Sequence, residues 1–299
     1  MNRRKFSRKA RPYVMIAPAI IGILVFTIYP IIKLIQLSLH NTNMLNPSQS
    51  KFVGLDNYEK VLSRPDFHKS LSNTVVYTIA VVFLITAIAL LLAVWLNEKN
   101  TRLNRIVQAA VFCPHVVSIV SIALIWLWMM EPNFGLFNYI LKELGLPTSK
   151  WLSGSATAMP SVILVSVWKA VGYDTLLLLA ALQSVPSSLY EAAKLDHANK
   201  VVMFFKITLP MISPQLFFTL IIRTISSFKV FDTVRILTQG GPNNATTTLV
   251  YSIYTEALLN LRVGYSAAIG VILLIIVSIL TVIYLSLIHI SEPTRLGMI

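Results

Sequence analysis

The chain has 299 residues, of which 56% are hydrophobic and only 12% are charged, and its mean hydropathy is +0.71. Soluble globular domains carry about 25% charged residues, so this composition excludes an ordinary soluble protein and indicates a membrane protein. The formal net charge is +13. The basic residues gather at the N-terminus and in loops between apolar runs, and this distribution argues against nucleic acid as a partner.

Six apolar runs divide the sequence, each near the length that a membrane-spanning helix needs. Crossing the hydrocarbon core takes about 20 predominantly apolar residues, and runs of this length span a membrane as helices rather than as barrel strands. We therefore expect an all-α, polytopic membrane helical bundle with about six transmembrane helices, occupying residues 13–284. In chain order the runs are Tyr13–Leu39, Asn73–Leu96, Ile106–Met130, Met159–Leu182, Met211–Leu237 and Tyr265 to about Leu285.

Residues 1–12 form a basic tail ahead of the first run. By the positive-inside rule this tail is cytoplasmic, and counting spans onward also places the basic loops at residues 99–105 and 194–206 inside. The loops expected outside carry some Lys and Arg as well, so the bias is not absolute. A cleavable signal peptide within residues 1–30 is the alternative, but its apolar segment would be too long. The basic residues of the tail are Arg3, Arg4, Lys5, Arg8, Lys9 and Arg11.

The fourth run contains two charged residues, Lys169 and Asp174, next to Trp168 and Tyr173. A charge within a spanning helix is costly and normally faces the bundle interior or a watery cavity, so we consider these residues candidates for a substrate pathway. Aromatic rings suit the apolar faces of sugars. Trp and Tyr are also common anchors at the membrane interface, and that reading stays open.

Residues 184–210 form a charged, amphipathic loop between the fourth and fifth runs. The spacing from Ser188 to Glu191 predicts a capping box at the start of a helix. Small and apolar side chains follow at Ala192, Ala193 and Leu195, and we expect a bend near His197 before a second short helix. Alternatively, Glu191 only caps the helix and the loop lies against lipid headgroups.

In or near the fifth run the charged candidates are Arg223, Lys229, Asp232 and Arg235, and the last three are each three residues from the next. If the helix continues through them, all three meet along one helical side. Lys229 and Asp232 are therefore candidates for the substrate pathway. An internal ladder of ion pairs is the alternative.

The C-terminal residues 285–299 need a separate interpretation. The string from Leu285 to Arg295, L-S-L-I-H-I-S-E-P-T-R, looks like the in-frame translation of a sequencing adapter. We interpret residues 285–299 as such an artefact, with a short cytoplasmic tail as the alternative, and we place no functional residue there.

The sequence carries little that indicates catalysis or cofactor binding. Cys113 is the single cysteine, so neither an intrachain disulfide nor a cysteine metal cage is possible. His68 and His115 lack partners at metal-ligand spacing. The sequence contains neither a Walker-type phosphate loop nor a G-x-G-x-x-G motif. We expect no catalytic, metal or cofactor site, and any ATP would be used by another polypeptide.

The loop resembles the "EAA" loop of bacterial ABC importer permeases. The matching residues are Glu191, Ala192, Ala193, Asp196, Ala198, Ile207, Leu209 and Pro210, and His197 stands where the family usually has Gly. Because Gly is favoured where φ is positive, either the bend is not left-handed here or coupling is altered. Further matches to the sugar-importer branch are Phe52–Tyr58, Phe134–Asn138, Phe228–Asp232 and Leu237–Pro242.

The resemblance implies a function and a set of partners. The chain looks like the first of two permeases in importers of the maltose and glycerol-3-phosphate type, in the bacterial inner membrane. It implies a second permease subunit, two cytoplasmic ATPase subunits, an extracytoplasmic solute-binding protein, a sugar-like substrate and surrounding membrane lipid. The ATPase-coupling residues would be Glu191, Ala192, Ala193, Asp196, His197 and Ala198.

Two other classes of function are alternatives for a chain of this composition. An ion-gradient-driven secondary transporter for a small polar solute would use Asp174 or Asp232 as its ion-coupling carboxylate. An integral membrane enzyme is disfavoured because the sequence lacks clustered His or Cys residues and paired carboxylates. We expect a transport subunit that performs no bond chemistry itself.

Overall fold

The structure is a computed structural model that describes residues 2–97 and 101–291, with side chains described for residues 13–46, 48–97 and 101–286. It confirms the all-α membrane bundle. Five helices are long and apolar enough to cross a membrane, and a bent helix pair brings the number to as many as six. The five are Tyr13–Ser38, Pro65–Asn97, Ala158–Gln183, Lys200–Phe228 and Val263–Ser286.

The third predicted span is not one helix. Helix α5 (Arg102–Val116) and helix α6 (Ile119–Met129) meet at an angle of 99°. Pro114 lacks a backbone N–H, and after Val116 the backbone leaves the helical region, with ψ of 142° at Val117 and 134° at Ser118, so the helical hydrogen bonds do not continue. The prediction of a continuous helix over Ile106–Met130 is therefore wrong.

The fifth span is shifted from its predicted position. It is built from α10 (Lys200–Met203), the π-helix η4 (Phe204–Thr208) and α11 (Leu209–Phe228), and it ends before the predicted Leu237. Non-helical backbone at Phe231 then separates it from α12 (Asp232–Leu237). The sequence predicted that Lys229, Asp232 and Arg235 lie along one side of a continuous helix. This prediction is wrong, because the helix is interrupted between Lys229 and Asp232.

In the part of the chain that the structure describes, a π-helix precedes a proline twice. The first span consists of α1 (Asn2–Ile23), the π-helix η1 (Leu24–Ile28) and α2 (Tyr29–Ser38), with Pro30 in the first turn of α2. In the fifth span Pro210 stands in the same position after η4. Because proline removes a donor and crowds the preceding turn, a wider turn before it lets the helix pass through without a break.

The chain divides into two compact units. The first contains the residues up to Arg64 and Ile253–Ile275, and the second contains Pro65–Ser252 and the residues from Ile276 onward. The remaining elements are the strands β1 (His40–Asn41) and β2 (Lys51–Phe52), the helices α3 (Asp56–Ser63), α4 (Pro65–Asn97), α7 (Leu136–Glu143), α8 (Ala158–Gln183), α9 (Ser187–Leu195), α13 (Leu249–Tyr254) and α14 (Val263–Ser291), the 3₁₀ turns η2 (Pro47–Gln49) and η3 (Trp151–Ser153), and the π-helix η5 (Thr255–Leu259).

The first unit contains a small hairpin in which β1 pairs antiparallel with β2, with His40 opposite Phe52. Asn57 holds this hairpin from α3, because its amide donates to the carbonyls of Ser38 at 2.8 Å and His40 at 3.0 Å. Gly264 packs so closely on His40 that an added Cβ would lie 1.9 Å from the His40 carbonyl oxygen. The Phe52–Tyr58 motif is thus a structural support for this hairpin.

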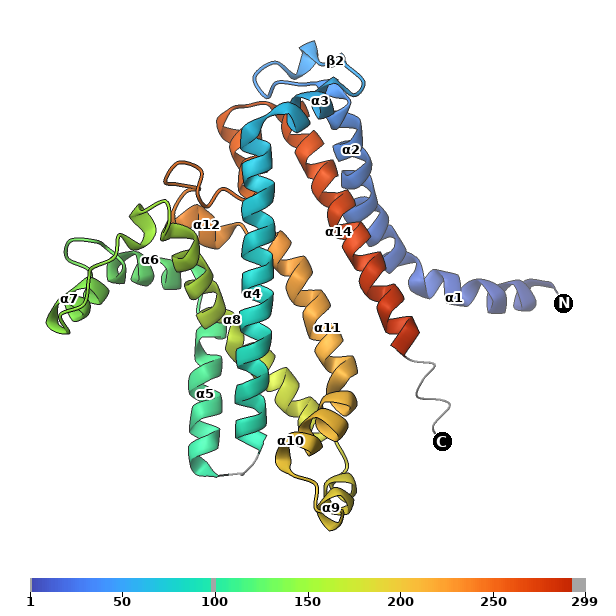
Figure 1. The fold of residues 1–299 in the computed structure, drawn as a ribbon. Coiled ribbons are helices and arrows are strands. Elements are labelled where there is room, and N and C mark those ends of the chain that lie inside the picture. The colour runs from blue at the N-terminus through green and yellow to red at the C-terminus, as the bar shows by residue number, and fades with distance from the viewer. Residues whose placement is uncertain (1, 98–100, 292–299) are drawn as a thin grey trace. The chain divides into compact units, whose positions relative to one another are not determined.

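The second unit is organised around α8, which packs along both α4 and α5, while α11 packs along α4 (Figure 1). Small side chains permit these close approaches in a membrane. A Cβ added at Gly172 on α8 would lie 1.9 Å from the carbonyl oxygen of Val111 on α5. The buried cluster at one end of this bundle contains Ala89, Ala93, Leu96, Val171, Leu178, Leu179, Leu182, Val185 and Ile212.

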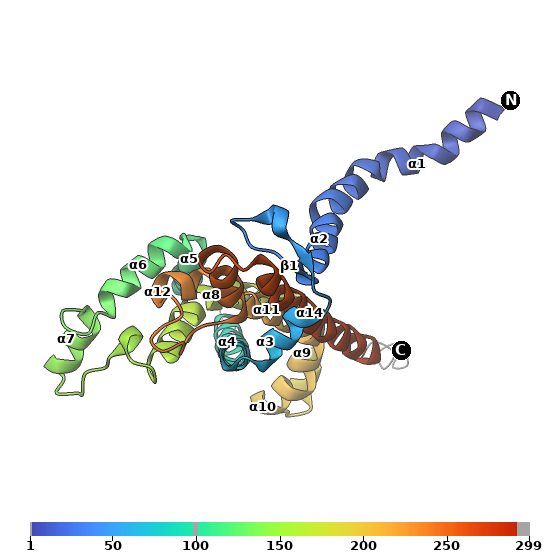
Figure 2. The same cartoon turned by 90° about the horizontal axis from the view of Figure 1, so that it is seen from above.

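Two parts of the second unit project from the helical bundle. Helices α6 and α7 turn aside from α5, as seen in Figures 1 and 2. Helices α9 and α10 form a loop at one end of α8 and α11, at the opposite end from α12 (Figure 1).

The two predicted terminal regions are only partly described. Residues 2–12 of the basic tail continue into α1 as helix, and α14 continues through residues 285–291. Residues 292–299 of the interpreted adapter string lie outside the described residues. The artefact interpretation stays a prediction.

Candidate functional site

The loop between the fourth and fifth spans begins with α9. The sequence predicted a capping box from Ser188 to Glu191, and this detail is wrong. The N-cap is Pro186, without a side-chain capping bond, so the helix starts at Ser187. Ser188 is then the second helical residue and Glu191 lies beyond the first turn, where its carboxylate is exposed to solvent instead of closing the cap.

The predicted bend follows α9 at His197, which has a φ of +52°. The His197 N–H donates to the Lys194 carbonyl at 3.1 Å, and the Ala198 N–H donates to the Ala193 carbonyl at 2.9 Å. These two bonds form a Schellman motif, in which the residue after the C-cap is left-handed and is usually Gly. His197 therefore keeps the left-handed bend despite carrying a side chain, and an effect of His197 on coupling stays a prediction.

The loop presents an open apolar and acidic surface. Glu191, Ala192 and Asp196 are exposed, Ala193 is half-buried, and Leu195 is 82% exposed. Small side chains beside a carboxylate allow a partner backbone to approach and a partner Arg to bind in bidentate fashion. The chemistry of this face suits a protein partner.

A side-chain hydrogen bond ties α9 to the fifth span. The Tyr190 hydroxyl lies 2.9 Å from the hydroxyl of Thr208, the last residue of η4. Thr208 is buried, and Tyr190 packs against the cluster around Leu182 and Ile212. Helix α9 is therefore connected to the fifth span by a direct side-chain contact as well as through the backbone.

A cavity of about 340 Å³ lies elsewhere in the second unit, among α4, α8, α11, α12 and the α5–α6 break. Its wall is strongly polar for a membrane bundle. Because charged groups inside a membrane protein normally face such cavities, this is the place in the unit best suited to a polar solute. The lining residues are Tyr77, His115, Ile119, Ser166, Lys169, Ala170, Arg223, Lys229, Val230, Phe231, Asp232 and Thr233.

Asp174 is engaged in an ion pair with Arg223 between α8 and α11. The Arg223 Nε donates to one Asp174 carboxylate oxygen at 3.0 Å, and a terminal guanidinium nitrogen donates to the other oxygen. The Asp174 side chain is 2% exposed and that of Arg223 is 17% exposed. This bidentate geometry satisfies both carboxylate oxygens, so within the described chain Asp174 acts as an anchor for Arg223 and not as part of the cavity wall.

Lys169 stabilises the break between α5 and α6. Its ammonium donates to the carbonyls of Pro114 and His115 at 3.2 Å each and to that of Val117 at 2.8 Å. A helix end inside a membrane leaves carbonyls without intrahelical partners, and a cation near a C-terminus also complements the helix dipole. Lys169 thus combines a structural role with a place in the cavity wall.

Of the other residues predicted for the substrate pathway, some line the cavity and some do not. Lys229 and Asp232 both line the cavity and are exposed. Trp168 packs its ring edge-to-face on Trp126 at 5.4 Å, and Tyr173 stacks on His115 at 4.6 Å. The cavity therefore brings together Lys169, Lys229 and Asp232. Tyr173 and Asp174 do not line it but contact the lining residues His115 and Arg223, and Trp168 contacts Trp126 outside the cavity wall.

Sequence reasoning missed several polar cavity residues. The Tyr77 hydroxyl on α4 donates to Ser166 on α8 at 2.8 Å, and His115, interpreted as merely structural, also lines the cavity. Single hydroxyl residues on long apolar helices give no signal that separates them from packing residues. In the described part of the chain, groups of three or more His, Cys, Asp or Glu suited to a metal ion are absent.

Comparison of the sequence with known proteins shows that this chain belongs to a class of transport permeases. Residues 65–295 match the model of the family described as "Binding-protein-dependent transport system inner membrane component". The arabinooligosaccharides transport system permease protein AraP of Bacillus subtilis (strain 168) is 37% identical over 284 residues, covering 94% of this chain and 90% of AraP. The sn-glycerol-3-phosphate transport system permease protein UgpA of Pectobacterium atrosepticum is 36% identical over 288 residues, covering 94% and 95% of the two chains.

A solved structure agrees with these sequence relatives. A chain of a bacterial alginate ABC transporter, crystallised in complex with an alginate pentasaccharide-bound periplasmic protein, matches with a TM-score of 0.84 and 26% identity over 98% of both chains. The chain belongs to the family of binding-protein-dependent transport system inner membrane components. It is a multi-pass inner-membrane transport subunit, as the resemblance of its Glu191 loop predicted.

Proposed function

We propose that this chain is one of two permease subunits of an ABC importer and that its α9–α10 loop receives a cytoplasmic ATPase subunit. The complex would also contain a second ATPase subunit and an external solute-binding protein, with the N-terminus of this chain in the cytoplasm. One observation carries the proposal: an exposed Glu191, Ala192 and Leu195 surface sits on a helix that is bonded to the fifth span through Tyr190 and Thr208.

The proposed mechanism is mechanical. ATP is bound and hydrolysed by the partner subunits, and the resulting movement displaces α9. Because α9 joins α8 through the chain and η4 through Tyr190, the displacement changes how α8 and α11 pack. The spans would then alternate between outward and inward openings while the chain itself performs no bond chemistry.

The substrate we propose is a carbohydrate or a related polar solute. The printed names of the relatives refer to arabinooligosaccharides and sn-glycerol-3-phosphate, and the similar solved structure belongs to an alginate transporter. The cavity offers hydroxyls at Tyr77 and Ser166 and charges at Lys229 and Asp232, which can hydrogen-bond sugar hydroxyl groups. Lys229 and Asp232 are the proposed contacts, with Trp168, Tyr173, Lys169 and Asp174 positioning the pathway wall.

Replacing Glu191 by Ala tests the coupling role. We expect Glu191→Ala to insert normally but to lose stable association with the ATPase subunits, and uptake with it. Glu59→Ala is the matched control, because Glu59 is also an exposed helical carboxylate, on α3. Unchanged assembly and uptake in Glu191→Ala would refute the proposal.

An ion-driven secondary transporter is the second candidate considered, and the Asp174 geometry speaks against it. A coupling carboxylate must exchange its ion, whereas Asp174 is held by two bonds from Arg223. Asp232 remains exposed in the cavity wall and is the carboxylate such a mechanism would use. Solute uptake into proteoliposomes that hold only this chain and an ion gradient would favour that candidate.

A further inference from the structure

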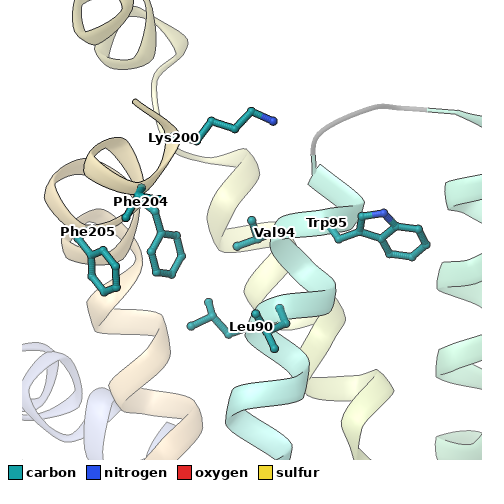
Figure 3. A pocket seen from close by; sticks show the side chains of 8 residues that line it. Leu90, Val94, Trp95, Lys200, Phe204 and Phe205 are labelled. Carbon is teal, nitrogen blue, oxygen red and sulfur yellow. The ribbon is translucent and has the colours of Figure 1, made fainter. Parts of the chain in front are cut away.

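An apolar groove runs beside the proposed coupling loop, between the last turns of α4 and the start of the fifth span (Figure 3). Its volume is about 450 Å³. The wall contributed by α4 consists of Leu90, Leu91, Val94 and Trp95. The opposite wall consists of Lys200, Val201, Phe204 and Phe205.

The π-helix shapes the second wall. A π-helix closes hydrogen bonds from i to i+5, so its turn is wider and consecutive side chains diverge less than in an α-helix. Phe204 and Phe205 can therefore both line the groove, with ring centroids 5.1 Å apart in an edge-to-face arrangement. Figure 3 shows the two rings on one side and Leu90 and Val94 on the other.

The groove has one charged end. Lys200 is the charged member of its wall, and Figure 3 shows its side chain reaching out at the end farthest from Leu90. Lys200 is the first residue of α10, where the chain enters the membrane span that extends to Phe228. Trp95 lies two residues before the end of α4 at Asn97, a position typical of aromatic residues at the membrane interface.

This arrangement matches an amphiphile with an anionic head and an apolar body. A single fatty chain would bury its methylene groups against the leucine, valine and phenylalanine side chains, and its phosphate would meet the Lys200 ammonium. Basic residues next to apolar grooves between membrane helices are a known mode of recognition for anionic lipid headgroups. Apolar side chains of the groove are also exposed on the chain itself, Leu91 by 71% and Phe205 by 61%, and an acyl chain would cover them.

We propose that this groove is a binding site for an anionic phospholipid. The lipid would occupy the space between α4 and η4 and thereby restrain the fifth span next to the loop. The lipid site depends on the proposed function in one respect, the leaflet that the groove faces. A cytoplasmic N-terminus places the groove in the inner leaflet. A partner subunit covering the groove is the competing outcome.

Quenching of Trp95 fluorescence by brominated lipids tests the proposal in the reconstituted transporter. The Trp95 contribution is obtained as the difference between the unmodified chain and Trp95→Phe. We expect dibromo-phosphatidylglycerol to compete for the site about fivefold better than dibromo-phosphatidylcholine, the equivalent of the roughly 1 kcal/mol associated with one lysine near an anionic headgroup. Lys200→Gln should abolish this preference.

Lys206→Gln is the matched control, because Lys206 is an exposed lysine of the adjoining π-helix η4 that does not line the groove in the described chain. It should keep the preference. Equal quenching by both lipids in the unmodified complex would overturn the proposal, as would a preference that survives Lys200→Gln. Quenching by neither lipid in the complex, but by both in the chain alone, would show a protein subunit in the groove and would equally overturn it.

The quenching assay and the Glu191→Ala experiment can refute the lipid site and the coupling role separately. Lipid is present on both sides of a reconstituted bilayer, so quenching does not depend on orientation, ATPase association or uptake. A lost lipid preference with intact dependence on Glu191 would refute the lipid site alone. A retained preference with no effect of Glu191→Ala would refute the coupling role alone.

Discussion

The hydroxyl groups of Tyr190 and Thr208 lie 2.9 Å apart and join α9 to the π-helix that begins the fifth span. If this bond transmits displacement of the loop, removing it should weaken coupling. We expect Tyr190→Phe and Thr208→Val each to lower substrate-stimulated ATP hydrolysis of the complex while leaving ATPase association intact. The double variant should be no worse than either single variant, because a hydrogen bond is lost only once. The coupling energy in this cycle should be about 1 kcal/mol.

A fully additive double variant would contradict the Tyr190–Thr208 link. In that case the loop would act through the backbone alone, and the two hydroxyls would serve only local packing. Steady-state ATP hydrolysis with and without substrate and binding protein, measured on all four proteins, separates these outcomes.

The left-handed backbone at His197 predicts how substitutions there behave. His197→Gly should be tolerated, since Gly adopts positive φ without a steric penalty. His197→Val should disturb the bend, because a β-branched residue at positive φ is strongly disfavoured. Limited proteolysis of residues 184–210 should be faster in His197→Val and no faster in His197→Gly. Equal cleavage of the Val and Gly variants would show that the bend does not require the left-handed conformation.

The buried ion pair predicts an asymmetric response to mutation. Asp174→Leu leaves the Arg223 guanidinium without its counterion in the bundle, and this loss should cost about 3–5 kcal/mol. Replacing both residues, as Asp174→Leu with Arg223→Met, should recover most of the stability, because two uncharged side chains need no mutual compensation. Thermal unfolding of the purified proteins in detergent provides the comparison. A double variant as unstable as Asp174→Leu would mean that the pair is not the main partner of either residue.

Lys169 and Lys229 line the same cavity but should differ in effect. Lys169→Met removes three hydrogen bonds from the α5–α6 break, so amide hydrogen exchange at residues 115–119 should increase. Lys229→Met should leave exchange there unchanged and lower uptake instead. Hydrogen exchange and uptake measured on both variants test this division. Unchanged exchange in Lys169→Met would show that the break is held by packing alone.

The sequence predicted the membrane bundle, the loop and its bend, because apolar run length and turn chemistry are local signals. It did not predict the break after Val116, since hydropathy continues across residues 106–130 without interruption. A tertiary contact lies at this break, where Lys169 on α8 donates to the freed carbonyls, and such a contact leaves no local signal in the sequence. Similarly, the Asp174–Arg223 pair joins residues 49 positions apart, a partnership that no spacing rule reveals. The predicted ladder of Lys229, Asp232 and Arg235 failed because Phe231 interrupts the helix.

The side of the membrane on which the α9–α10 loop lies tests the central claim most directly. A cysteine placed at Leu195, which is 82% exposed, in a chain with Cys113→Ala would report accessibility to a membrane-impermeant thiol reagent. We predict no labelling in intact cells, labelling in inverted membrane vesicles, and protection in those vesicles when the ATPase subunits are bound. Labelling of this cysteine from outside intact cells would contradict the account.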